Sequence, residues 1–245
     1  MTSRFSIGNV ISRSLSIYTA NFVPFILIAL IIQAPMIIYG FMATADPFAA
    51  DFLIQSQEAS PFKPLLESLV SMVLANIVTG AIIFGVFQQL QGERVDMSTC
   101  VTVGLKRVLP VVGVGLIFGI CVVLGMVLLI IPGIILFCML LLAVPVAVVE
   151  GGGVGNALRR SATLTQGFRW SILGIFAIIY AILMVLTMIV TMVGMSSGFT
   201  VLLVGLQGVS LICGTWISVA TAVTYHDIRA SKENVDTRQL AEVFA

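Results

Sequence analysis

Residues 109–149 read LPVVGVGLIFGICVVLGMVLLIIPGIILFCMLLLAVPVAVV, an apolar run without a charged residue. A transmembrane helix needs about 20 such residues, so the run is roughly twice as long as one crossing. Pro132 and Gly133 lie in its second half, and both residue types break helices. We therefore expect two spans joined by a turn at residues 131–134. The alternative is one long, kinked helix.

The composition of the whole chain agrees with a membrane protein. Of its 245 residues, 59% are hydrophobic and 9% are charged, whereas soluble domains average about 25% charged residues. The mean hydropathy is +1.15. The formal net charge of +1 lacks the excess of positive charge that marks a nucleic-acid-binding protein. We expect a polytopic membrane protein with no nucleic-acid partner.

Six apolar stretches of spanning length divide the sequence evenly. We expect one all-α membrane domain, residues 1–245, whose six transmembrane helices form three hairpins. The first stretch is interpreted as an uncleaved helix, although residues 43–45 also fit the small-residue pattern of a cleavage site. The predicted spans are 22–43, 68–90, 109–130, 132–149, 170–194 and 200–223.

The basic residues predict the orientation, because Lys and Arg collect in cytoplasmic loops. With the N-terminus inside, Lys63 is the one basic residue outside, in a loop (44–67) that also carries Asp46, Asp51, Glu58 and Glu67. Both termini are therefore expected in the cytoplasm. The basic residues expected inside are Arg4, Arg13, Arg94, Lys106, Arg107, Arg159, Arg160, Arg169, Arg229, Lys232 and Arg238.

A repeat precedes the predicted hairpins. Residues 7–14, IGNVISRS, and residues 154–161, VGNALRRS, share Gly, Asn, Arg and Ser in register, and a weaker copy begins at residue 97. Apolar residues at helical spacing predict amphipathic cytoplasmic helices in the headgroup region. Such basic helices are attracted to anionic lipid, either as anchors alone or as sites that recognise a headgroup. The predicted interfacial helices are 5–20, 96–108 and 154–168.

Several motifs resemble the bacterial membrane domain associated with glycerophosphoryl diester phosphodiesterases. The resemblance covers residues 100–235 well and the first hairpin loosely, and it implies a lipid-associated or accessory role in the bacterial inner membrane. The matching motifs are IPGI (131–134), PV (145–146), VEG (149–151), ALRRS (157–161), LT (164–165), Gly167, RW (169–170) and YHDIR (225–229), followed by KE (232–233).

The chain departs from that family in two places. Family members often carry an Arg near Cys138 or Met139, which is absent here, and commonly a second Tyr where this chain has His226. The phosphodiesterase barrel takes about 250 residues, for which the sequence has no room. The resemblance therefore implies an accessory membrane role without hydrolysis.

Catalytic and metal-binding residues are not evident in the sequence. The predicted spans contain no Asp, Glu, His, Lys or Arg, and His226 is the single histidine. Catalysis within a membrane needs such groups facing a cavity. We expect a protein that is not an enzyme and has no catalytic residue, metal site or cofactor.

Charged residues at the predicted inner interface are the candidates for binding. Glu150 precedes a glycine run and is expected within reach of Arg159 and Arg160. The pair could be a salt bridge that fixes the helix. Alternatively, the arginines could hold a lipid phosphate, because guanidinium groups match phosphate oxygens. The further candidates at this interface are Arg169, Asp227 and Arg229.

The polar side chains within the predicted spans include Gln33, Asn76 and Gln207, with hydroxyls at Thr79, Ser210, Thr215 and Ser218. Gln33, Asn76 and Gln207 lie at similar expected depths and could meet, forming interhelical hydrogen bonds or lining a path for water or substrate. We therefore expect a scaffold or accessory subunit that binds membrane lipids, anionic ones among them, with a protein partner or a second copy as further candidates. The alternative is a transporter or channel for a small or lipidic substrate.

Overall fold

The computed structural model describes residues 6–45 and 62–233, and throughout these ranges the regular structure is helical. Several charged residues used to predict the orientation lie outside the described residues, namely Arg4, Asp46, Asp51, Glu58 and Arg238. Within the described part, six segments are long and apolar enough to cross a membrane. The chain is therefore a multi-pass, all-α membrane protein.

Within 6–45 and within 62–233, the helices follow one another with short connections. The element order is α1 (Ile7–Ala20), α2 (Phe22–Ala45), α4 (Phe62–Leu90), α5 (Met97–Lys106), α6 (Val108–Leu128), α7 (Ile130–Leu140), α8 (Ala143–Val149), α9 (Val154–Leu164), α10 (Arg169–Ser197) and α11 (Phe199–Glu233).

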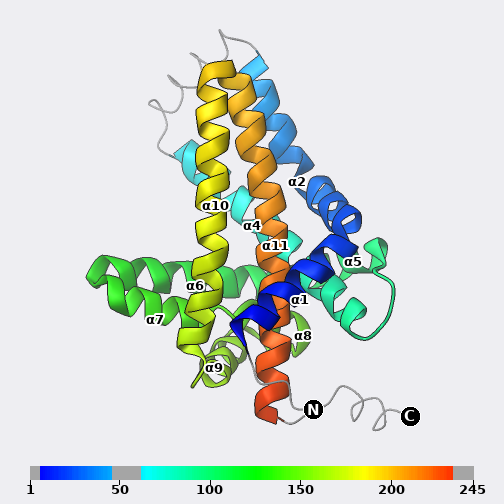
Figure 1. Cartoon of the computed structure of the whole chain (residues 1–245), viewed down its shortest axis with the longest axis vertical. Helices are drawn as coiled ribbons and strands as arrows, with labels where there is room; N and C mark the ends of the chain where they lie inside the picture. The colour runs from blue at the N-terminus through cyan, green and yellow to red at the C-terminus, as the bar shows by residue number, and fades with distance from the viewer. Residues whose placement is uncertain (1–5, 46–61, 234–245) are drawn as a thin grey trace.

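The longest helices lie along one direction, and one hairpin lies across it. In Figure 1, α10 and α11 run side by side along the long axis of the molecule, and α2 leans toward their upper ends. The hairpin of α6 and α7 leaves the bundle sideways, at about the height of α1 and α5. Helix α1 crosses the lower half of α11, and α9 lies below α6 and α7.

The tightly packed core lies in the lower half of the molecule, around α11. Phe25, Ile82, Phe176 and Tyr225 are among its largest fully buried side chains. Upward along α10 the side chains become exposed, as at Met188, which is 65% exposed. Lipid tails are as apolar as these side chains, so an exposed apolar face is stable there, whereas the lower half is held by packing and polar contacts.

The turn between α6 and α7 falls at Leu129, before the predicted residues 131–134. Leu129 has extended backbone angles (φ −162°, ψ 142°). Pro132 lies in the first turn of α7, where the missing N–H of proline leaves no hydrogen bond unmade. The predicted position of the turn was wrong because the proline begins the second helix.

Gly133 contributes to this hairpin by close packing. A Cβ on Gly125 would lie 2.9 Å from the Cα of Gly133, and a Cβ on Gly133 would lie 2.7 Å from the backbone nitrogen of Met126. Two glycines facing each other thus allow the backbones of α6 and α7 to touch.

Other boundaries also differ from the prediction. The predicted fourth span is divided, because α7 ends at Leu140 and α8 begins at Ala143, with Pro145 in its first turn. Helix α4 begins at Phe62, and α11 continues to Glu233, well past residue 223. Hydropathy marks only the apolar part of a helix, so it misses polar extensions at the ends.

Helices α1, α5 and α9 occupy the predicted interfacial segments. Asp96 caps α5 by accepting hydrogen bonds from the backbone nitrogens of Ser98 and Thr99, a common way to satisfy a helix N-terminus. Helix α9 ends at Leu164, earlier than the predicted residue 168, and Gly167 (φ 87°) turns the chain into α10.

Candidate functional site

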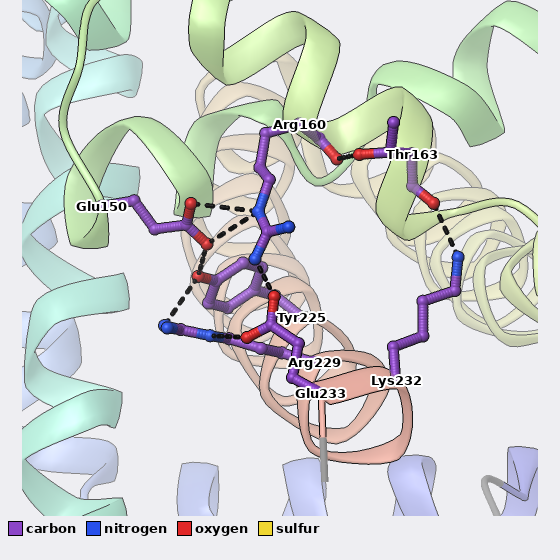
Figure 2. A network of polar contacts seen from close by, with 7 residues as sticks. All are labelled: Glu150, Arg160, Thr163, Tyr225, Arg229, Lys232 and Glu233. Atoms are coloured by element: carbon purple, nitrogen blue, oxygen red, sulfur yellow. Dashed lines mark hydrogen bonds and ion pairs between the residues drawn. The ribbon is translucent and has the colours of Figure 1, made fainter. Parts of the chain in front are cut away.

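A network of charged and polar side chains joins α11 to the segment around α8 and α9 (Figure 2). Glu150 follows α8 directly, and Arg160 lies on α9. Tyr225, Arg229 and Glu233 are spaced four residues apart on α11, which places them on one face of that helix. We call these five residues the α11 clamp.

Glu150 is the acceptor at the centre of the α11 clamp. Its Oε1 accepts a hydrogen bond from the Tyr225 hydroxyl at 2.6 Å. The Arg160 Nε donates to both carboxylate oxygens of Glu150, at 3.2 and 3.4 Å. The carboxylate of Glu150 therefore links α11, a helix of the third hairpin, to α9, the helix that precedes this hairpin.

Glu233 completes the α11 clamp from the end of α11. It accepts hydrogen bonds from the Arg160 Nη2 and, at 2.9 Å, from the Arg229 Nε. The Arg229 Nη1 also donates to the Tyr225 hydroxyl at 3.2 Å. Each arginine of the clamp thus meets a carboxylate of opposite charge.

Burial in the α11 clamp is uneven, which bears on its strength. Tyr225 is fully buried, whereas the Glu150 and Arg160 side chains are 25% and 36% exposed. Hydrogen bonds to charged groups are stronger than neutral ones, but partial exposure to solvent weakens ion pairs. The buried Tyr225–Glu150 hydrogen bond is therefore expected to stabilise the clamp more than the exposed pairs do.

A glycine turn sets the distance between Glu150 and α9. Gly151, Gly152 and Gly153 have φ angles of 71°, 84° and 83°, a region that glycine adopts without the steric penalty of other residues. A Cβ on Gly151 would also lie 2.7 Å from Nη1 of Arg107. The turn therefore depends on glycine both for its backbone angles and for the approach of an arginine.

A shallow cavity of about 300 Å³ lies beside the α11 clamp. Arg159 on its wall is exposed and, among the described residues, forms no ion pair. Two arginines, an amide, a hydroxyl and a glycine backbone, which are groups able to hold an anion, line this hollow together with the carboxylate of Glu150. The lining residues are Val146, Glu150, Gly151, Asn156, Arg159, Arg160 and Thr163.

A second ion pair holds α11 from α1. The Arg13 Nη1 lies 2.7 Å from the Asp227 Oδ1, and His226 Nδ1 lies 3.1 Å from the same oxygen. Arg13 and Arg160 are the matching arginines of the sequence repeat. In both copies of the repeat, the arginine therefore pairs with an acidic side chain near the C-terminal end of α11.

The remaining interface candidates do not join the α11 clamp. Asp227 pairs with Arg13, away from Glu150. Arg169 begins α10 and is half-buried, and its Nε has no hydrogen-bond partner among the described residues. Arg159 lines the cavity without taking part in the clamp.

The polar residues Gln33, Asn76 and Gln207 do not meet through hydrogen bonds in the described part of the chain. Asn76 donates to the Met72 carbonyl of its own helix, and its side chain lies against Gly115 of α6. Gln207 lines a separate apolar groove. Gln33 lies half-buried on α2. Asn76 and Gln207 thus lie against different neighbours.

Two members of the α11 clamp, Tyr225 and Glu233, were not among the predicted site residues. Both are named in the sequence analysis only within the motifs of the family resemblance, YHDIR (225–229) and KE (232–233). The i, i+4, i+8 spacing of Tyr225, Arg229 and Glu233 would have found them, had the helix been extended beyond the apolar stretch.

The described residues contain no group of three or more His, Cys, Asp or Glu side chains able to hold a metal ion. The α11 clamp is instead a set of matched charges, suited to holding helices together. Comparisons with protein-family models, with curated proteins and with solved structures find no match to this chain.

Proposed function

We propose that this protein is a non-enzymatic scaffold or accessory subunit of the bacterial inner membrane. Both termini face the cytoplasm, and its basic lower face binds the headgroups of anionic phospholipids. The observation that carries this proposal is the cavity beside the α11 clamp, where Arg159 stands exposed next to an arginine already held by carboxylates.

The charge around the cavity favours an anion. Five basic side chains surround the cavity and the α11 clamp, against the two carboxylates of Glu150 and Glu233. The α11 clamp neutralises both carboxylates with Arg160 and Arg229. A positive excess therefore remains for a phosphate. The basic side chains are Arg107, Arg159, Arg160, Arg229 and Lys232.

The faces of α9 support a position at the membrane surface. Ala157, Ser161 and Leu164 are buried against the bundle, whereas Arg159 and Thr163 are exposed. A basic residue close to an anionic leaflet contributes about 1 kcal/mol to membrane attraction. The positive-inside rule places this face in the cytoplasm.

The α11 clamp supports the scaffold part of the proposal. It fixes α9 against α11 through paired charges. Arg160 therefore positions α9, and Arg159, which is outside the clamp, is available to bind a ligand. The sequence resemblance to the membrane domain associated with glycerophosphoryl diester phosphodiesterases adds the proposal that the protein acts beside lipid or lipid-handling partners, a protein or a second copy of this chain included.

The test is native mass spectrometry of the purified protein titrated with phosphatidylglycerol. Arg159→Gln should weaken binding by about fivefold, since loss of roughly 1 kcal/mol lowers an equilibrium constant by nearly that factor. Arg94→Gln is the matched control, because Arg94 is also exposed but lies outside the cavity. Equal lipid binding by wild type and Arg159→Gln would overturn the headgroup site.

A second candidate function, transport of a small or lipidic substrate, is favoured by one observation. A groove of about 430 Å³ lies between α2 and α11, apolar except for the side chain of Gln207. Flux of a lipidic or small solute into proteoliposomes that collapses in Gln207→Leu would replace the scaffold proposal with transport. Equal flux in protein-free liposomes would dismiss it.

A further inference from the structure

The hairpin of α6 and α7 ends in an entirely aliphatic tip. Val127, Leu128, Leu129, Ile130 and Ile131 follow one another, and each is 67–78% exposed. If the tip reached the outer membrane surface, these side chains would be exposed to water. Exposing apolar area to water costs free energy. The tip is therefore built for hydrocarbon.

The hairpin of α10 and α11 provides the contrast within the same chain. Its turn reads Ser196, Ser197 and Gly198, and Gly198 has a φ of 115°. Small polar residues with a glycine are the usual composition of a turn in water. One hairpin thus ends in residues suited to water, and the other ends in residues suited to lipid.

The length of α7 fits half a bilayer. Its 11 residues rise about 16 Å at 1.5 Å per residue, against a hydrocarbon core of about 30 Å. After a turn, α8 is a separate helix, and Val146, Ala147 and Val148 are buried against the bundle. By length alone, α6 (21 residues) and the segment Ile130–Val149 (20 residues) could each cross, so the inference rests on the apolar tip and on the sideways course of the hairpin.

The packing of α7 agrees with a hairpin that runs across α10 and not along it. Its Phe137 contacts α10 at Phe176 and Tyr180, which lie one turn apart, with ring centroids 6.2 and 6.4 Å away. On α6, Val111 and Val114 are buried near the start, and Gly125 is buried near the end, against Gly133 of α7. Figure 1 shows the hairpin running sideways from α10 and α11 at about the height of α1.

The turn at the tip satisfies part of its own backbone hydrogen bonding. A single residue, Leu129, connects the helices, and its N–H donates to the Gly125 carbonyl at 3.0 Å. Its carbonyl accepts from the Gly133 N–H at 3.3 Å, and Pro132 has no N–H to satisfy. In the described part of the chain, the carbonyls of Met126, Val127 and Leu128 and the N–H groups of Ile130 and Ile131 form no further backbone hydrogen bond at this junction, as is usual at helix ends.

We infer that the α6–α7 hairpin inserts into the acyl chains of the inner leaflet alone and does not emerge on the outer face. Four helices, α2, α4, α10 and α11, then cross the membrane. The two ends of the hairpin stay on the same side in either case, so the distribution of basic residues is preserved. The choice of leaflet rests on the proposed orientation.

Single cysteines test the inference in a background where Cys100, Cys121, Cys138 and Cys213 are replaced by Ala. Leu129→Cys marks the tip, Ser197→Cys marks the α10–α11 turn, and Glu93→Cys marks the loop before α5. A membrane-impermeant maleimide is applied to spheroplasts and to inverted vesicles from cells that express each full-length variant.

The expected result is labelling of Ser197→Cys in spheroplasts and of Glu93→Cys in inverted vesicles. Leu129→Cys should react in neither and should react after detergent is added. Labelling of Leu129→Cys in spheroplasts would show that the hairpin crosses, and labelling in inverted vesicles would show that its tip lies in water. Either result overturns the inference.

Two controls keep the outcome interpretable. If Ser197→Cys and Glu93→Cys exchange sides, the proposed orientation fails and the assignment to the inner leaflet fails with it. Val127→Cys repeats the measurement away from the turn residue itself. A bimane label at either tip position should be quenched more strongly by nitroxides along the acyl chain than by nitroxides on the headgroup, and the reverse order would also overturn the inference.

Discussion

Removing one hydroxyl from the α11 clamp should measure how much it stabilises the fold. Tyr225→Phe keeps the aromatic ring, which packs edge-on against Phe87 at 5.8 Å. It loses the 2.6 Å hydrogen bond to Glu150 and the weaker 3.2 Å hydrogen bond from Arg229. Hydrogen bonds to charged groups contribute about 1.5–3 kcal/mol. Because the Glu150 side chain is 25% exposed, water replaces part of the loss, and we expect about 1–2 kcal/mol.

Thermal unfolding in a mild detergent, followed by tryptophan fluorescence, provides the assay. A loss of 1 kcal/mol lowers Tm by about 2–4 °C in chains of roughly this size, so Tyr225→Phe should lower it by about 2–8 °C. The matched control is Tyr39→Phe, because Tyr39 also donates to a glutamate, Glu67, at 2.7 Å, but is 41% exposed. Exposed substitutions usually change stability by less than about 0.5 kcal/mol.

Equal shifts in the two variants would refute the view that burial makes the Tyr225 hydrogen bond stronger than the exposed one. The double variant Glu150→Gln with Tyr225→Phe gives a further check. Groups in direct contact usually show coupling energies of about 0.5–3 kcal/mol, so the two losses should be less than additive. Full additivity would show that the hydroxyl and the carboxylate act independently.

Three further predictions concern other parts of the chain. Gly133→Ala should destabilise the α6–α7 hairpin by about 1–3 kcal/mol, because the added methyl meets backbone atoms of Met126; an unchanged Tm would contradict this contact. Hydrogen bonds from Thr99 and Ser98 hold the pKa of Asp96 below its usual value, so its stabilising effect is complete above the unfolded pKa near 3.9 and is lost as pH falls through the lower, folded pKa. The difference in Tm between wild type and Asp96→Ala should therefore shrink in strong acid, and a constant difference would contradict it. Burial raises the pKa of the Cys100 thiol to about 11, so iodoacetamide at pH 8 should alkylate Cys100 only after unfolding, as mass spectrometry of the peptides would show.

Composition and hydropathy predicted the helical class and the six apolar segments, because the bilayer demands long apolar helices whatever their packing. They misplaced the turn at Leu129, since Pro132 and Gly133 can end a helix or begin one. Ending a helix and beginning one differ only in which backbone N–H groups need hydrogen-bond partners. This depends on the residues that precede Pro132 and Gly133. The sequence pattern did not reveal how far each hairpin enters the membrane.

The α11 clamp could be predicted only in part. Glu150 and Arg160 lie ten residues apart, so local spacing was enough to suggest that they approach each other. Tyr225 lies 75 residues from Glu150 and Glu233 lies 73 residues from Arg160, so these contacts form only through tertiary packing. Sequence periodicity shows which residues share a helix face, but not which other helix that face will meet.

The repeat described above divides the molecule unequally. Its first and last copies place Arg13 and Arg160 against acidic residues of α11, whereas the middle copy, α5, packs mainly on α4. Ion pairs thus fix the first and last units of the repeat to the same helix, α11. Among the described residues, no such ion pair fixes the middle unit to α11. A change in bilayer thickness or lateral pressure would therefore act first on α6 and α7, which can alter their tilt without separating either of these ion pairs.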